Sequence, residues 1–346
     1  MNENFDFQFD PQNEINMSDS DKRSHKKIFS KICLAFLAYM AISQVLSVVA
    51  GLVIGLFAPQ LFYSQDFLML ITSVIQYVIA FPILYKLLKS IPKQAPVRTR
   101  VGAKRFLKYA AVAMLFMYIG NYISNFLLTW VESLLGRVPE NAVNAMLDNT
   151  NIFVSLLIVG IVGPIFEELI FRKLFIDRLM PYGDKVAIFL PALIFGLFHG
   201  NLYQFFYAFF IGAVFSYIYI KTGEIMYSTL LHIFINIFCG VFPTAIFSML
   251  DYNELIEIIS AGALTEEYLN ANMLPLSLFL IYSYGMLAMV GIGLIVFWRN
   301  ARKIQFNKGE IRFPKGSGGD IMFFNVGSIA LIMSCILLIA YNTFAL

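Results

Sequence analysis

The sequence predicts an all-α protein, a polytopic bundle of about eight or nine transmembrane helices. Of its 346 residues, 59% are hydrophobic and only 14% are charged, whereas about 25% of the residues of a soluble domain are charged. Apolar runs of about 20 residues, the length that crosses a bilayer as a helix, recur along the whole chain. This composition excludes a soluble enzyme with a single membrane anchor.

Nine apolar segments are predicted to span the membrane. They lie at 33–57, 68–88, 106–130, 152–175, 184–199, 202–220, 225–249, 275–298 and 321–344. The fifth segment is short for a full crossing, because an α-helix rises only ~1.5 Å per residue. Pro191 lies within it and predicts a kink.

The connections between the segments alternate in charge, which predicts the orientation of the chain. The connection at 86–108 contains basic residues and no acidic ones, and the one at 251–272 contains acidic residues and no basic ones. Basic connections stay on the cytoplasmic side. We therefore expect a multi-pass protein of the cell (plasma) membrane with its N-terminus in the cytoplasm.

The N-terminal residues 1–31 are polar, and we expect a disordered cytoplasmic tail there. A cleavable signal peptide would have an earlier and shorter apolar core, so the first span is predicted to be retained. The three cysteines, Cys33, Cys239 and Cys335, lie in apolar segments without the spacing of a metal site. They are expected to be small buried side chains and not disulfide partners.

A small set of ionisable residues lies inside the predicted spans. Glu167 and Glu168 are the only acids well inside any span, and His199 and His232 are the only histidines there. A charged group in the membrane is costly, so such residues indicate function by default.

The spacing of these residues places them on three helix faces. Glu168 and Arg172 are four residues apart, so they share a face and can pair, while Glu167 points about 100° away. The same spacing separates two further pairs, Phe195 with His199 and His232 with Asn236. Lipid cannot satisfy polar side chains, so we expect the helices to turn these faces toward one another.

The chemistry of this set is that of amide or ester hydrolysis. A carboxylate and an imidazole can together hold and deprotonate a water molecule. A second imidazole and a carboxamide can donate hydrogen bonds to the oxyanion that forms. No serine or cysteine lies beside a base at matching depth, so a covalent nucleophile is not indicated.

Three short motifs resemble those of the CPBP family, which contains CAAX prenyl proteases and bacteriocin-processing or self-immunity (Abi) proteins. The motifs are EELIFR with Glu167, Glu168 and Arg172, FGLFH with Phe195 and His199, and HIFIN with His232 and Asn236. They match EExxxR, FxxxH and HxxxN in the family's order.

The resemblance implies an intramembrane glutamic endopeptidase with no cofactor. Glu167 and His199 would activate the water, and His232 and Asn236 would form the oxyanion hole. Glu168, Arg172 and Phe195 would support the site. The chain would then divide into the tail at 1–31, N-terminal transmembrane helices at 32–149, the CPBP/Abi catalytic core at 150–250, and an external loop with two C-terminal transmembrane helices at 251–346.

Two alternatives stay open. Glu167, His199 and His232 could instead supply three zinc ligands with an open fourth position, as in a membrane metalloprotease. Buried Glu and His residues could also form the proton relay of a transporter, or belong to a signalling scaffold. In every case the partners include membrane lipid. For the protease they also include a membrane-bound or lipidated peptide, whereas nucleic acid is not indicated. The oligomeric state is left open.

Overall fold

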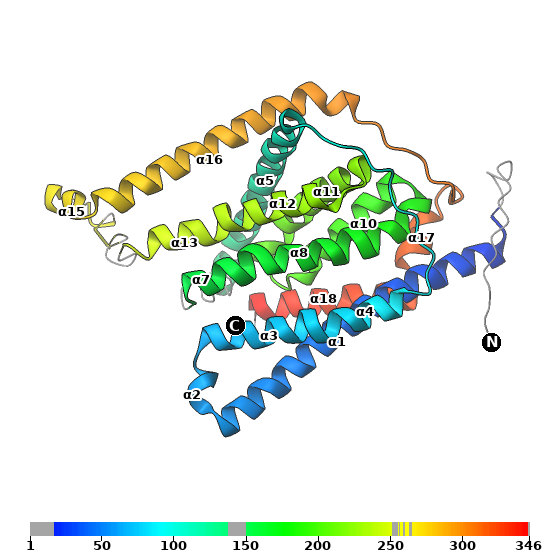
Figure 1. Cartoon of the computed structure of the whole chain (residues 1–346), viewed down its shortest axis with the longest axis horizontal. Coiled ribbons are helices and arrows are strands. Elements are labelled where there is room, and N and C mark those ends of the chain that lie inside the picture. Colours follow the sequence, from blue (N-terminus) through cyan, green and yellow to red (C-terminus); the bar gives the residue numbers. More distant parts are fainter. Residues whose placement is uncertain are drawn as a thin grey trace.

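The structure is a computed structural model that describes residues 17–137, 150–250, 255, 257–258, 260–262 and 265–344. Figure 1 shows most of the helices lying side by side along the long axis of the molecule. Helix α16 (Met273–Asn300) lies at one edge, and α1 (Asp19–Phe57) and α3 (Gln65–Val74) lie at the opposite edge. Every regular element in the described ranges is helical, which confirms the predicted all-α bundle.

Among the residues that the structure describes, eight helices or runs of consecutive helices are long and apolar enough to cross a membrane. They are Asp19–Phe57, Gln65–Leu88, Ala103–Leu135, Ile152–Tyr182, Leu202–Thr222, Ile225–Phe247, Met273–Lys303 and Val326–Phe344. Each of them contains or overlaps one of the predicted spans. The chain is therefore a multi-pass membrane protein with a helical-bundle fold.

The predicted fifth span is the exception. It forms α10 (Asp184–Phe198), whose 15 residues rise only about 22 Å and do not cross a full bilayer. A short connection joins it to α11 (Leu202–Thr222), and the two helices pack closely. A Cβ at Gly196 would lie 2.7 Å from the carbonyl oxygen of Phe205. The position of α10 is therefore fixed by packing against neighbouring helices and not by a full crossing of the membrane.

The predicted tail is wrong from Asp19 onward, because α1 already begins there. Ser18 caps the helix: its Oγ accepts a hydrogen bond from the backbone N–H of Asp21 at 3.2 Å, and Asp21 Oδ2 accepts one from the backbone N–H of Ser18 at 3.3 Å. Phe29 is fully buried and packs against Tyr182. The helix therefore extends before the apolar run because its first turns cover a distant part of the chain. Residues 1–16 of that tail lie outside the described residues.

The remaining short elements connect the long helices. The second span is built from α3, η1 (Ile75–Ala80) and α4 (Phe81–Leu88), and α2 (Pro59–Phe62) precedes it. Helix α5 (Ala103–Leu135) packs against both α11 and α16. The last span, α18 (Val326–Phe344), follows α17 (Gly318–Phe323) and packs against α1. All three cysteines are free, and Cys33 and Cys335 are buried.

Close approach of α16 to α5 depends on a glycine and gives a first testable prediction. A Cβ at Gly293 would overlap the carbonyl oxygen of Ala111, whereas a Cβ at Gly291 would meet nothing within 4 Å. We therefore expect Gly293→Ala to lower the melting temperature of the detergent-solubilised protein. Gly291→Ala, on the same helix, should leave it unchanged or raise it, because alanine favours a helix over glycine by about 1 kcal/mol. Equal melting temperatures for the two variants would contradict the close packing of α16 on α5.

Candidate active site

The helix that carries the two glutamates is interrupted by π-helical turns. It runs through α7 (Ile152–Ser155), η2 (Leu156–Val162), α8 (Gly163–Glu168), η3 (Leu169–Ile176), α9 (Asp177–Leu179) and η4 (Met180–Tyr182). Both glutamates therefore lie at the end of a single α-helical turn between two π segments. Such π turns often occur at functional sites.

Pro164 leaves a backbone carbonyl of this helix without its own donor. At the end of η2 the N–H of Gly163 bonds to the carbonyl oxygen of Ile158, five residues earlier. In the same register the carbonyl of Val159 would face the nitrogen of Pro164, which has no hydrogen. Asn236 Nδ2 donates to this carbonyl oxygen at 2.9 Å. Lipid offers no water to bond the carbonyl oxygen of Val159, so Asn236 satisfies it. Asn236, the predicted oxyanion donor, therefore already has a structural partner.

The pair between Glu168 and Arg172 is present and fully buried. Arg172 Nε lies 3.2 Å from Glu168 Oε2, and neither side chain is exposed. The guanidinium lies between two phenyl rings, with its carbon 5.0 Å from the ring centre of Phe195 and 5.3 Å from that of Phe215. A cation between two aromatic faces gains further electrostatic stabilisation. Phe195, predicted as a supporting residue, therefore contacts this arginine.

His232 connects the two glutamates. It lies on α12 (Ile225–Asn236), and its Nδ1 donates to Glu168 Oε1 at 3.0 Å. Its Nε2 lies 3.5 Å from Glu167 Oε2. The side chain is almost fully buried. Counting residues along the predicted span places His232 shallower in the membrane than the glutamates. The packing of α12 against α8 removes this difference.

His199 lies at the end of α10, and its position restricts its tautomer. Its Nδ1 lies 2.8 Å from the carbonyl oxygen of Phe195. A carbonyl only accepts, so Nδ1 carries the hydrogen and Nε2 holds the lone pair of the neutral ring. Nε2 is the nitrogen that can accept a proton, as a water-activating base requires.

A small pocket of about 80 Å³ joins His199 to Glu167. By the same measure a water molecule needs roughly 10–15 Å³, so the pocket has room for water. Its other lining residues are Tyr39, Gln76, Ile170, Phe171, Phe195 and Phe198. Neither His232 nor Asn236 lines it. The glutamate at its wall is partly exposed, with 27% of its side chain accessible.

Two polar residues of this pocket, Tyr39 and Gln76, are not predicted from the sequence. Tyr39 comes from α1 and is only 2% exposed, and its hydroxyl faces Gln76 without forming a hydrogen bond of normal geometry. Gln76 comes from η1. A tyrosine in an apolar helix is typical of packing and gives no signal. Gln76 could have been found, because it is the only carboxamide in its predicted span and a polar side chain there is costly.

The zinc alternative needs three ligands that converge. Within the described ranges, no group of three or more His, Cys, Asp or Glu side chains is arranged to hold a metal ion. His232 directs its two nitrogens to the two glutamates, whereas Nδ1 of His199 is bonded to its own helix. The arrangement is that of a hydrogen-bonded network of acids and bases.

Comparison with known proteins agrees with the three motifs. A family model described as "Type II CAAX prenyl endopeptidase Rce1-like" matches residues 149–238. The protein "Putative membrane peptidase YdiL" of Bacillus subtilis (strain 168) is 29% identical over 177 residues, which cover 48% of this chain and 68% of the relative. Residues 149–238 of this chain therefore resemble the CAAX-protease members of the CPBP family. No solved structure matches it.

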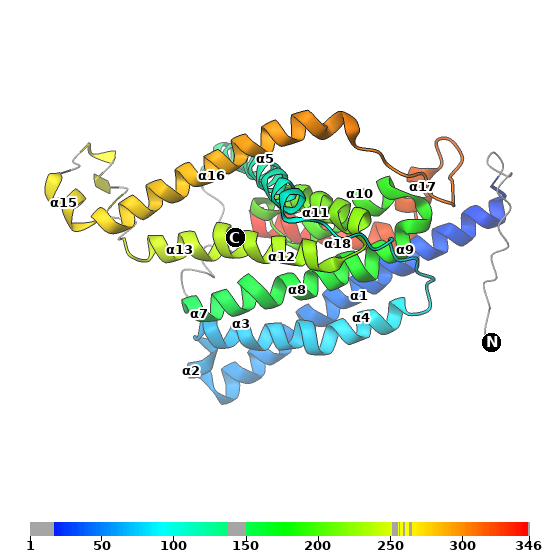
Figure 2. The same cartoon turned by 45° about the horizontal axis from the view of Figure 1, so that its top comes forward.

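The matched segment contains all seven motif residues from Glu167 to Asn236. The comparisons support a membrane protease of the CAAX endopeptidase type. Tyr39 and Gln76 lie outside the matched segment and reach its pocket from the N-terminal helices. Figure 2 shows α3 and α4 running beside α8, with α1 next to them.

Proposed function

We propose that this protein is an intramembrane glutamic endopeptidase that hydrolyses a peptide bond of a membrane-associated peptide or protein. The observation that carries this proposal is the pocket with room for water between Glu167 and His199. Both residues can accept a proton from a water molecule held between them, Glu167 through its carboxylate and His199 through Nε2. The metal and cofactor chemistry of other proteases is not needed for this step.

In the proposed reaction, the water gives its proton to Glu167 and its oxygen bonds to the carbonyl carbon of the substrate. The electron pair of the C=O bond moves to the oxygen and forms a tetrahedral intermediate. The intermediate then releases the amine, which takes the proton from Glu167. His199 holds the attacking water through Nε2, while Glu168, Arg172 and His232 hold Glu167 and its helix in place. Their buried ion pair and hydrogen bonds support this positioning role.

The developing oxyanion needs hydrogen-bond donors. The family resemblance assigns this role to His232 and Asn236, and we retain it as part of the proposal. In the structure His232 bonds to Glu168 and Asn236 to Val159, so these donors need to turn or share their hydrogens when substrate binds. Tyr39 already lines the pocket, and its hydroxyl faces Gln76 without a hydrogen bond of normal geometry. It supplies a further donor in the proposed site.

Replacing Tyr39 by phenylalanine tests this role. We expect kcat to fall by about 10²–10³-fold with little change in KM, the usual effect of removing one oxyanion donor. The matched control is Tyr182→Phe, which removes the hydroxyl of another buried tyrosine, bonded to His25 far from the pocket. That variant should retain its kcat. A Tyr39→Phe protein with normal kcat would show that the hydroxyl only packs.

The proposed substrate class is a membrane-bound or lipidated peptide. Candidates are a prenylated CAAX-type C-terminus, or a bacteriocin or pheromone precursor, with self-immunity as a further biological role. A suitable assay uses the purified protein in liposomes with two quenched fluorescent peptides, one prenylated and one unmodified and apolar. Preferential cleavage of the first supports CAAX-type processing. Comparing the proteomes of cells that express the wild type or Glu167→Gln would identify the natural substrate.

The same assay addresses metal dependence. The glutamic mechanism requires activity that persists in metal-free protein after treatment with a chelator. Stoichiometric zinc whose removal abolishes cleavage would instead support the zinc protease. We further propose that the chain lies in the plasma membrane with its N-terminus in the cytoplasm, because its basic connections then face the cytoplasm.

A further inference from the structure

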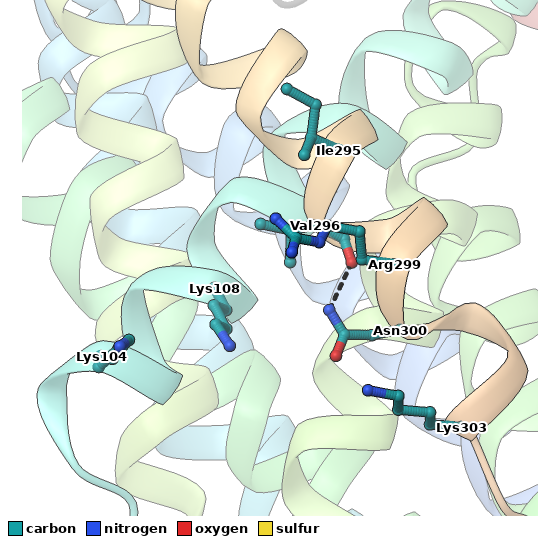
Figure 3. Close-up of a pocket in the computed structure, with 7 residues that line it drawn as sticks. All are labelled: Lys104, Lys108, Ile295, Val296, Arg299, Asn300 and Lys303. Carbon is teal, nitrogen blue, oxygen red and sulfur yellow. Dashed lines mark hydrogen bonds between the residues drawn. The ribbon is translucent and has the colours of Figure 1, made fainter.

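A groove with four basic side chains lies between α5 and α16, away from the proposed active site. Its volume is about 410 Å³. The basic residues are Lys104 and Lys108 of α5, Arg299 of α16, and Lys303 of the following turn η6 (Ala301–Lys303). Figure 3 shows Lys108, Arg299 and Lys303 pointing into the space between the two helices, with Lys104 at its outer end. The other lining residues are Ile295, Val296 and Asn300, so no acid lines the groove.

The four charges in this groove, which we call the basic groove, have no acidic partner within the described part of the protein. None of them forms an ion pair there, although other basic residues do. Four such pairs are Lys26–Asp320, Arg98–Glu224, Lys173–Asp177 and Lys221–Asp184. The simplest alternative is a basic surface that is only solvated by water. Such a surface does not require the side chains of two separate helices to converge. Their convergence indicates a common anionic ligand.

The end of α5 strengthens this indication. Helix α5 begins at Ala103, its N-cap Gly102 provides no side-chain hydrogen bond, and its first turn contains no acid. The N-terminus of a helix carries a partial positive charge that acts on the first turn, so Lys104 lies where a cation is least favourable. An anion in the basic groove would relieve the repulsion among these charges and also interact with the helix end.

The surroundings of the basic groove are those of a lipid headgroup. Ile295 forms its apolar wall and is largely exposed, and Trp298 on the neighbouring turn is 80% exposed. Leu107, next to Lys108, is exposed as well. Tryptophan is enriched where the apolar core of the membrane meets the headgroups. An acyl chain can lie along Ile295 while the phosphate reaches the lysines and the arginine.

We propose that the basic groove binds one anionic phospholipid through its headgroup phosphate. The lipid would join the N-terminal end of α5 to the C-terminal end of α16, two helices that also pack against each other at Gly293 and Ala111. This site goes beyond the proposed peptidase activity and does not depend on it. Each cation near an anionic membrane surface contributes roughly a fivefold factor in affinity.

Native mass spectrometry of the full chain in detergent tests the proposal, with phosphatidylglycerol and phosphatidylcholine as probes. The groove variant combines Lys104→Gln, Lys108→Gln, Arg299→Gln and Lys303→Gln. The matched control has the same change in charge elsewhere among the basic residues, with Lys86→Gln, Lys89→Gln, Lys93→Gln and Arg100→Gln. Wild type and control should each retain one phosphatidylglycerol in preference to phosphatidylcholine. The groove variant should bind both lipids equally weakly.

Three results would overturn the proposal. One is equal retention of phosphatidylglycerol by the groove variant and the control. Another is the absence of any preference for phosphatidylglycerol in the wild type. The third is displacement of the lipid by inorganic phosphate at the same concentration, which would make the ligand a free anion. If the fourfold variant does not fold, Lys108→Gln with Lys303→Gln should lower the affinity roughly 25-fold, whereas Lys89→Gln with Lys93→Gln should not change it.

Discussion

Glu167→Gln is expected to lower the rate of peptide cleavage by about 10²–10⁴-fold, the range for loss of a general base. Glutamine has the same shape but cannot take the proton of the attacking water. Glu167 is also partly exposed and lacks the ion pair that compensates Glu168, so the fold should survive the change. The measurement is kcat for a fluorescent membrane peptide in liposomes, with the melting temperature recorded for the same preparation.

The control for this variant is Glu224→Gln, which neutralises a glutamate that pairs with the exposed Arg98. Its activity should equal that of the wild type. His199→Ala should behave like Glu167→Gln, because Nε2 of this ring lies at the same pocket. If a folded Glu167→Gln protein cleaved the peptide at the full rate, Glu167 would not be the base. If cellular function also persisted, a transporter or scaffold role would become the better explanation.

Arg172→Met is expected to destabilise the protein strongly, by about 3–5 kcal/mol. The substitution leaves Glu168 as a buried carboxylate without its cation, held only by the uncharged or shared hydrogens of neighbours such as His232 and Ser228. It also removes the cation from between Phe195 and Phe215. Melting curves and the fraction of folded protein in detergent measure the effect. The double variant Glu168→Gln, Arg172→Met should recover a large part of the loss, because no charge is then left unpaired.

Arg98→Met provides the comparison for this prediction. Its pair with Glu224 is long, at 3.6 Å, and the arginine side chain is 80% exposed. Exposed pairs contribute little, roughly 0–1 kcal/mol. Similar melting temperatures for Arg172→Met and Arg98→Met would mean that the buried pair does not hold the site together. A double variant no more stable than Arg172→Met would assign the loss to packing against the phenyl rings.

The fold class and the set of polar residues could be predicted because both are local properties of the sequence. Each span is visible in about 20 consecutive residues, and a glutamate inside such a run is conspicuous wherever the helix packs. The pair of Glu168 with Arg172 is also local, since it lies within one turn of one helix. The one predicted span that does not cross the membrane is α10, and its segment is already short for a crossing in the sequence.

Other parts of the site depend on residues far apart in the chain. The contacts of His232 with both glutamates come from the packing of α12 on α8, and the bond from Asn236 to Val159 comes from the carbonyl that Pro164 leaves unpaired. The part of α1 that precedes the predicted span contacts Tyr182 through Phe29. None of these contacts has a periodic signal in the sequence.

The sequence by itself determined a membrane-spanning helical bundle, its resemblance to the CPBP family and the residues that carry its buried charge. Hydropathy and the cost of a charge in lipid act along a single helix and can be read without a partner. Only the tertiary structure decided which atoms meet: His232 between two glutamates, Asn236 on a free carbonyl, and Tyr39 with Gln76 at the pocket. Such contacts are selected by the packing of whole helices, which short stretches of sequence do not specify.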